Sequence, residues 1–359
     1  MQNKIFILLI FLILIITSNF FSCTDQKIKV ALITNLTKAS EIGESEVLMS
    51  KLYLKLNPDS KIKIEYFNDG WNKDLEKKAI KEVLNKKIKF LITTHTSTVA
   101  NEILDIINSN DILDIVCGAT TINLSHKDDN HVRIVADVEE EQTQIANHIN
   151  ELKGKTVVLL IDSVNRGYTF LAKDYFKKYC NKNIFQEIYF NAENFNIDDL
   201  SSSFQNINNI DFAYFIVGSG FTRIGAIARF LLLKNKNIKI VFTPWVINPE
   251  LIKIIGLKSD NIIFSSFLPD FSNNTKINDI KNKFFKEYNI FPTIISYKVY
   301  QALEILDFAF KNKFIKPVGV KKFLLEKKQI PTIFENIIFD QYLDSHTKLY
   351  FLSNLYLFY

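Results

Sequence analysis

Along the first third of the chain, two spacings of apolar residues alternate: short continuous runs, and apolar residues three or four positions apart. Short apolar, β-branched runs such as Ile28–Thr34 are typical of buried strands, and apolar residues recurring every three or four positions are typical of amphipathic helices. The expected strands are Ile28–Thr34, Lys61–Phe67, Phe90–Thr93 and Ile112–Val116, and the expected helices are Glu44–Leu56, a stripe from Leu75 to Leu84, and Val99–Asn108. Strands that alternate with helices predict an α/β fold with a doubly wound parallel sheet.

The same order starts again beyond Glu139 and predicts a second sheet of this kind. Its expected helices are Gln142–Leu152, Thr169–Tyr179, Leu200–Ile207 and Arg223–Leu233, and its expected strands are Thr156–Ile161, Ile184–Phe190, Phe212–Val217, Ile238–Thr243 and Asn261–Ser266. Helices at Ile277–Tyr288 and Tyr297–Lys311 and short β segments at Ile337–Phe339 and Lys348–Leu352 follow. No Pro-, Gly- or Ser-rich linker separates the two halves. We therefore expect two lobes joined by a multi-strand hinge.

The start of the chain has the pattern of an export signal. Lys4 precedes an apolar run from Ile5 to Ile16, which is shorter than the roughly 20 residues of a bilayer span. Ser22 before Cys23 resembles the signal of bacterial lipoproteins, although Phe20 takes the place of the usual leucine. The resemblance implies that Cys23 is lipidated and that the lipid is the only membrane attachment. An ordinary cleaved signal near an unrelated cysteine is the alternative. Both interpretations place the protein outside the cytoplasm. Lipidation would also anchor it to the cell envelope, in the periplasm or on the outer face of the cytoplasmic membrane.

Composition narrows the classes of function. A hydrophobic content of 47% with 31 phenylalanines predicts substantial cores and excludes disorder. The formal net charge of +5 is spread along the chain without a dense basic block, so a nucleic-acid partner is not expected. Beyond Cys23 only Cys117 and Cys180 remain, in segments assigned to different lobes, which predicts neither a disulfide nor a metal signature. We expect no cofactor.

Two polar, small-residue loops follow adjacent strands of the first expected sheet. Ligands of open parallel sheets bind beyond the carboxyl ends of the strands. Thr94–Thr98 follows one strand, and its Ser97 and Thr98 offer hydroxyl and backbone N–H donors suited to a carboxylate or phosphate. Cys117–Thr121 follows the next strand and is also rich in donors. Helix capping is the alternative for each loop.

These loops stand in an ordered series of motifs that resembles a known family. The series comprises Gly43-Glu44, Asn68-Asp69, the serine loop at Ser97, Gly118-Ala119-Thr120-Thr121, Val132-Arg133, Asp162 through Gly167, Pro292 through Tyr300, and Phe339-Asp340. It is similar to the type 1 periplasmic binding proteins, in the leucine/isoleucine/valine-binding branch of ABC transporter solute receptors. The resemblance covers the chain from Ile28 to its end. It implies that the lobes are residues 23–138 with 268–328 and residues 139–267 with 329–359, after a signal peptide at 1–22.

The resemblance also implies a ligand site. The family holds an amino acid's carboxylate with loops that correspond to Ser97, Thr98, Ala119 and Thr120. Elsewhere the chain departs from the family: Arg166 takes the place of a pocket tyrosine, and Trp245 that of the acid that receives the ammonium group. Gly218-Ser219-Gly220 replaces an aromatic residue, which makes Ser219 a further candidate. Arg166 as a solvated loop residue and Trp245 as a plug between the lobes are the alternatives.

These departures indicate a small carboxylate-bearing ligand, an amino acid or a related compound. An aromatic or aliphatic carboxylate, or an anion-rich small metabolite, fits them better than an ordinary neutral α-amino acid. A buried ammonium without a counter-charge costs several kcal/mol, and a cation–π contact of about 2 kcal/mol replaces little of that. The sequence contains no nucleophile elbow, phosphate-binding loop or metal-binding histidine motif, so we expect a binding protein and not an enzyme. The implied role is a lipid-anchored solute receptor that presents its ligand to an ABC permease. The alternative is an envelope lipoprotein that uses the same fold for sensing or for protein interaction.

Overall fold

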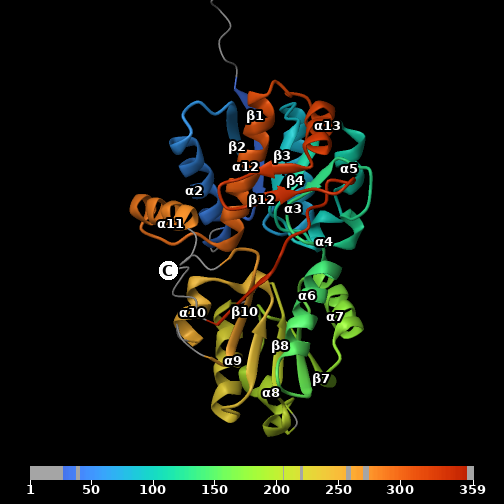
Figure 1. Cartoon of the computed structure of the whole chain (residues 1–359), viewed down its shortest axis with the longest axis vertical. Helices are drawn as coiled ribbons and strands as arrows, with labels where there is room; N and C mark the ends of the chain where they lie inside the picture. Colours follow the sequence, from blue (N-terminus) through green and yellow to red (C-terminus); the bar gives the residue numbers. More distant parts are fainter. Residues whose placement is uncertain are drawn as a thin grey trace, which may run out of the picture.

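The structure is a computed structural model that describes residues 27–37, 41–204, 206–218, 221–255, 260–269 and 275–353 (Figure 1). The signal peptide, Cys23 and Ser219 lie outside the described residues. The described chain forms two lobes stacked along the long axis of Figure 1, each built around a central sheet.

The first lobe contains a five-stranded parallel sheet in the order β2-β1-β3-β4-β5. Its strands are β1 (Ile28–Thr34), β2 (Ile62–Asn68), β3 (Phe90–Thr93), β4 (Leu113–Val116) and β5 (His131–Arg133). The apolar residues of β1, β3 and β4 are buried because helices cover both faces of the sheet. These helices are α2 (Glu41–Leu56), α3 (Lys73–Asn85), α4 (Ser97–Ala100), α5 (Leu104–Ser109), α11 (Thr275–Tyr288), α12 (Ile294–Lys311) and α13 (Pro317–Lys327).

The second lobe contains a six-stranded sheet in the order β13-β10-β9-β8-β6-β7. Its strands are β6 (Thr156–Asp162), β7 (Asn183–Phe190), β8 (Phe212–Ile216), β9 (Lys239–Phe242), β10 (Ile262–Ser266) and β13 (Tyr350–Leu352), of which only β13 is antiparallel to its neighbour. Its helices are α6 (Val138–Glu151), α7 (Arg166–Tyr179), α8 (Ile197–Ser202), α9 (Phe221–Lys234), α10 (Pro249–Ile255) and the 3₁₀ turns η2 (Ile207–Asn209) and η3 (Pro244–Val246). This is the expected α/β architecture with two doubly wound lobes.

The hairpin of β11 (Gln329–Pro331) and β12 (Asn336–Ile338) belongs to the first lobe and corrects one expected boundary. Gln301 Nε2 of α12 donates to Thr332 Oγ1 at 3.0 Å, and both Glu304 carboxylate oxygens accept from Ile333 N. The division at residue 329 therefore assigned this hairpin to the wrong lobe. The chain crosses to the second lobe only after β12, as the red segment of Figure 1 shows, and β13 then completes the second sheet.

A buried arginine connects this crossing between the lobes to the earlier crossing, which follows β5. Arg133, 1% exposed at the end of β5, has its Nη2 2.9 Å from Asp344 Oδ1 and donates through Nη1 to Thr121 O. Arg133 N also donates to Leu343 O, and Ser345 N donates to Arg133 O. The hinge therefore holds two crossing segments side by side through backbone bonds and one buried ion pair.

Some elements differ from the expectation. The single helix expected at Val99–Asn108 is divided into α4 and α5. The expected helix at Leu200–Ile207 is α8 followed by a separate 3₁₀ turn, and α10 and α13 were not expected at all. Within the described part of the chain, no helix has the length and apolar character that crossing a membrane requires.

Candidate functional site

A cleft lies where the two lobes meet, at the carboxyl ends of the parallel strands. Its empty volume is about 410 Å³, part of which opens to solvent. The first lobe contributes Ile42, Trp71, Thr94, His95, Thr96, Ser97, Gly118, Thr120 and Ile295, and the second lobe contributes Asn165, Tyr168, Gly218 and Trp245. Both lobes therefore face any ligand held there, as a closing receptor requires.

Ser97 and Thr120 form the polar floor of the cleft on the first lobe. Both follow strands, β3 and β4 respectively, and Thr120 N donates to Ser97 Oγ at 3.2 Å. The Thr120 hydroxyl is buried and has no hydrogen-bond partner. Gly118 lets the two loops approach, because a Cβ there would lie 2.8 Å from Thr94 O. An unpartnered buried hydroxyl beside a cleft is a position for a ligand acceptor atom.

The lobes touch each other beside the cleft through Thr98, Asn165 and Gly167. Thr98 Oγ1 donates to Asn165 Oδ1 at 3.0 Å and accepts from Gly167 N at 3.1 Å. A Cβ on Gly167 would lie 3.0 Å from both Thr98 N and Thr98 Cα. The described conformation is therefore one in which the lobes are closed on each other at this edge.

Trp245 forms the wall of the second lobe together with Tyr168. The two rings meet edge to face with centroids 6.3 Å apart, and Trp245 meets Phe267 in the same way at 4.8 Å. Behind them lies Glu141 of α6, which is fully buried. Its carboxylate accepts from Trp245 Nε1 at 3.0 Å, from Tyr168 OH at 2.5 Å and from Gln142 Nε2 at 2.7 Å. Desolvation raises the pKa of Glu141 to about 7, against the lowering effect of these hydrogen bonds.

The charge of the lining is low. The described residues that line the cleft include no Asp, Glu, Lys or Arg, and only His95 and Tyr168 among them titrate. Burial lowers the pKa of His95, but the carboxylates of Glu76, Asp114 and Asp69 raise it by more, so that it lies above its usual value. Burial also raises the pKa of the Tyr168 phenol well above its usual value, which keeps that side chain neutral.

The structure brings together only part of the site that the sequence predicted. Ser97, Thr120 and Trp245 line the cleft, and Thr98 forms the contact between the lobes. Ala119 is fully buried in a small apolar cluster with Val116 and Leu124 and does not reach the cleft.

The structure does not place Arg166, which we expected to bind the ligand, in the cleft. Its side chain is exposed, its Nε donates to Ser163 O, and its guanidinium lies 5.7 Å from the centre of the Phe170 ring. Arg166 does not line the cleft, because it begins α7 on the outer side while Tyr168, two residues later, faces inward. Ser219 lies outside the described residues, although its neighbour Gly218 lines the cleft.

Four residues in or directly behind the cleft were not found from the sequence: Trp71, Glu141, Asn165 and Tyr168. Tyr168 follows Gly167 directly and could have been recognised as the pocket tyrosine displaced by two positions. Trp71 follows Asp69-Gly70 at the carboxyl end of β2, the same type of position that singled out Ser97. Glu141 gave no local signal, since it is one of three consecutive glutamates at the start of a helix.

The comparisons with known proteins agree with this geometry. A family model described as periplasmic binding protein matches residues 27–341. The chain belongs to the periplasmic binding protein family. The family recognised from the sequence motifs and the fold expected from it are thereby confirmed. Curated protein sequences give no match.

Several solved structures share the fold. LivJ from Streptococcus pneumoniae, in complex with isoleucine, has a TM-score of 0.80 and 15% identity, covering 91% of this chain and 96% of its own. A solute-binding protein from Rhodopseudomonas palustris in complex with benzoate has a TM-score of 0.79 and 15% identity, covering 92% and 94%. Another from R. palustris BisB5, in complex with 3,4-dihydroxybenzoic acid, has a TM-score of 0.77 and 17% identity, covering 91% and 92%. At these identities the likeness concerns the fold.

Family membership defines the general class of this protein. Periplasmic binding proteins are extracytoplasmic proteins that bind ligands and carry out no catalysis. The two-lobed fold and the cleft between the lobes match this class.

Proposed function

We propose that this protein is the solute-binding component of an ABC importer and binds a small carboxylate between its lobes. The proposal rests on the cleft, which has hydroxyl and backbone donors on one lobe and an aromatic wall on the other. Binding would shift an equilibrium between open and closed lobes because only the closed form contacts the ligand from both sides. The closed form would then be recognised by the permease.

The single observation that carries the ligand class is the lack of a carboxylate among the described lining residues. Glu141 lies close behind the wall but already accepts from three donors, including the indole of Trp245. The ammonium group of a neutral amino acid would therefore find no counter-charge among the described residues that line the cleft, and a buried ammonium without one costs several kcal/mol. Trp71, Tyr168 and Trp245 offer ring faces and edges instead. An aromatic carboxylate without an α-ammonium group fits this surface better than leucine, isoleucine or valine.

Arg166 has no part in this proposal. The carboxylate would be bound by the Thr120 hydroxyl and by donors of the serine loop, which are neutral. Charge-assisted hydrogen bonds of this kind contribute roughly 1.5–3 kcal/mol each. Two or three of them suffice for a receptor with micromolar affinity when apolar burial is added.

A thermal-shift screen of the chain from Thr24 to Tyr359 tests the ligand class. Benzoate, 4-hydroxybenzoate and 3,4-dihydroxybenzoate form one arm, and leucine, isoleucine and valine form the other. We expect a benzoate-type ligand to stabilise the protein by about 2.7 kcal/mol at a hundred times its dissociation constant. At the same concentration, the amino acids should stabilise the protein less. Greater stabilisation by leucine would contradict the proposed class. No response to any small molecule would favour a sensing or protein-interaction role in the envelope.

We also propose that the protein is anchored to the cell envelope by a lipid on Cys23. The proposal rests on the sequence pattern of residues 1–23. In cells, Cys23→Ser should move the protein from the membrane fraction to the soluble fraction, whereas Cys180→Ser, which removes a free thiol of the second lobe, should not. A Cys23→Ser protein that remains with membranes after a high-salt wash would show that another attachment holds it.

A further inference from the structure

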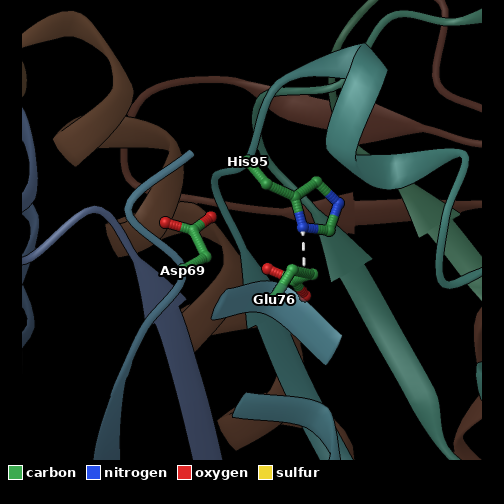
Figure 2. A group of neighbouring side chains, drawn as sticks. All are labelled: Asp69, Glu76 and His95. Atoms are coloured by element: carbon green, nitrogen blue, oxygen red, sulfur yellow. Dashed lines mark ion pairs between the residues drawn. The ribbon is translucent and has the colours of Figure 1, made fainter. Parts of the chain in front are cut away.

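Three titratable side chains meet beneath the cleft, at the carboxyl ends of two strands of the first sheet. Asp69 follows β2, Glu76 lies in the first turns of α3, and His95 lies in the loop after β3. Figure 2 shows Glu76 and His95 facing each other, with Asp69 beside them. One ligand atom from each of the three lies within 4.8 Å of the other two. The Asp69, Glu76 and His95 side chains are called the buried triad below.

The triad is buried, and several of its polar atoms form no hydrogen bond, although His95 Nδ1 and Glu76 Oε1 lie 3.6 Å apart as an ion pair (Figure 2). The exposed fraction is 0% for Asp69 and Glu76 and 1% for His95. Asp69 Oδ2, both carboxylate oxygens of Glu76 and His95 Nδ1 have no hydrogen-bond partner. Four such atoms in one place are unusual, because buried polar atoms almost always have a partner. They indicate a group that binds all of them at once.

The charge of the triad suits a cation. Two carboxylates with a protonated imidazole keep one negative charge, and burial of an uncompensated charge costs several kcal/mol. The charged groups that act most strongly on His95 are Glu76, Asp114 and Asp69, all acidic. A divalent cation with a neutral imidazole and two carboxylates makes the set neutral.

Protonation of the carboxylates explains the geometry less well. A protonated carboxyl is a donor and would form a short hydrogen bond to its neighbour. The distance between His95 Nδ1 and Glu76 Oε1 is 3.6 Å, which exceeds that of a hydrogen bond. It is instead close to the separation of about 3.4 Å between two ligand atoms that bind one zinc ion at 2.0–2.2 Å in tetrahedral geometry.

The surroundings of the triad also suit a metal ion. Asp69 Oδ1 accepts from Trp71 N at 3.1 Å, which orients the carboxylate so that Oδ2 remains available. His95 and Trp71 line the cleft, so an ion can reach the triad from that side. Imidazole with carboxylate ligands is a donor set that suits zinc among divalent transition metals.

We propose that Asp69, Glu76 and His95 bind a divalent transition-metal ion, tested here as zinc, beneath the floor of the ligand cleft. The bound ion would join the segments that follow β2 and β3 to α3, beneath the serine loop. The proposal is independent of the proposed transport function, because it concerns the metal alone.

Zinc content and thermal stability of the untagged chain from Thr24 to Tyr359 test the proposal. The protein is stripped of metal with a chelator, incubated with ZnCl₂, dialysed and assayed for zinc by mass spectrometry. We expect about one zinc ion per chain and a higher melting temperature with zinc than with chelator. Glu76→Gln and His95→Gln should each raise the Kd for zinc at least about tenfold, because the first replaces a carboxylate by a neutral amide and the second removes the imidazole.

Two variants control for misfolding and for binding elsewhere. His131→Gln removes a buried histidine that lies 3.2 Å from Asp114, outside the triad, and should bind zinc normally. His126→Gln removes the histidine of a second group with Asp340 and Asp344, and should also bind normally, since Asp344 is already paired with Arg133. The proposal is overturned if the unmodified protein binds no zinc, if Glu76→Gln and His95→Gln bind it unchanged, or if only His126→Gln abolishes binding.

Discussion

Thr120 has two polar groups with separate tasks. Its backbone N–H donates to Ser97 Oγ and fixes the two loops to each other, whereas its hydroxyl is buried, unpartnered and next to the cleft. Ser97 differs, because its hydroxyl oxygen already serves as the acceptor of that backbone bond. A substitution at Thr120 therefore separates ligand binding from loop structure better than one at Ser97.

Thr120→Val should weaken ligand binding and leave the fold intact. Valine has nearly the same shape, and the backbone bond to Ser97 is retained, so only the hydroxyl is lost. We expect a loss of roughly 1.5–3 kcal/mol in the free energy of binding a carboxylate, which is the value of a hydrogen bond to a charged group. Calorimetry with the ligand identified by the screen measures it. Thr143→Val, which removes a hydroxyl that donates to Glu139 O on α6, is the control. Equal affinities of the two variants would show that the Thr120 hydroxyl does not touch the ligand.

The residues of the site could be predicted only where a local rule applied. Ser97 and Thr120 follow strands of a parallel sheet, and this position alone made them candidates. Arg166 was chosen by alignment with a family position, but the first turn of α7 turns its side chain outward and Tyr168 inward. Glu141 became visible only in three dimensions, since its partners Tyr168 and Trp245 are distant in the sequence.

At the scale of elements, Glu141 joins three parts of the second lobe. It lies on α6 and accepts hydrogen bonds from Tyr168 on α7 and Trp245 on η3, and its neighbour Gln142 accepts from Tyr214 on β8. This network sets the position of the aromatic wall. Its centre is a carboxyl group whose pKa burial raises to about 7.

Glu141→Gln should remove part of the pH dependence of stability. The folded-state pKa of about 7 lies above the ordinary value of 4.5, so the contribution of Glu141 to stability is present below pH 4.5 and is lost as pH rises through 7. Between pH 4.5 and pH 8, the unfolding free energy of the wild type should fall by about 3 kcal/mol more than that of the variant. Urea unfolding at several pH values measures this difference. Glu151→Gln, on the exposed face of the same helix, should show no such change. Parallel pH profiles of wild type and Glu141→Gln would mean that the carboxyl titrates normally.

Regular elements were predictable where the hydrophobic period was uninterrupted. The strands β1, β3, β4 and β8 match their apolar runs closely because each is buried on both faces. The single helix expected at Val99–Asn108 is interrupted because α4 ends at Ala100, and the next residue, Asn101, accepts a hydrogen bond from Asn123 Nδ2 on its Oδ1 at 3.1 Å. That hydrogen bond to a 3₁₀ turn (η1, Ile122–Leu124) 22 positions away has no signature in the local sequence.

At the scale of the whole molecule, the sequence predicted two lobes and a hinge but placed one crossing too early. The hairpin β11–β12 is short and polar at its ends, and nothing in its pattern shows that α12 provides its hydrogen-bond partners. Closure of the lobes was also beyond sequence reasoning. It depends on how closely α7 approaches the serine loop, which is a property of a single glycine.

Gly167→Ala should hold the lobes apart. An added Cβ would lie 2.8 Å from Thr98 Oγ1 and 3.0 Å from the Thr98 backbone, and the backbone cannot move away without disturbing the serine loop. Opening the lobes relieves the clash without unfolding either one. Overpacking of this kind costs about 1–3 kcal/mol, so ligand affinity should fall by about tenfold or more while the unfolding free energy changes little.

Small-angle scattering without ligand gives a readout that does not depend on ligand identity, and we expect a larger radius of gyration for Gly167→Ala than for wild type. Gly319→Ala on α13 is the matched control, because its nearest neighbour would be a side-chain carbon of Phe314 at 3.7 Å, an ordinary contact. If Gly167→Ala matched this control in both scattering and affinity, the contact between Thr98 and Gly167 would not limit closure. A change in scattering without a change in affinity would mean that the ligand binds to one lobe alone.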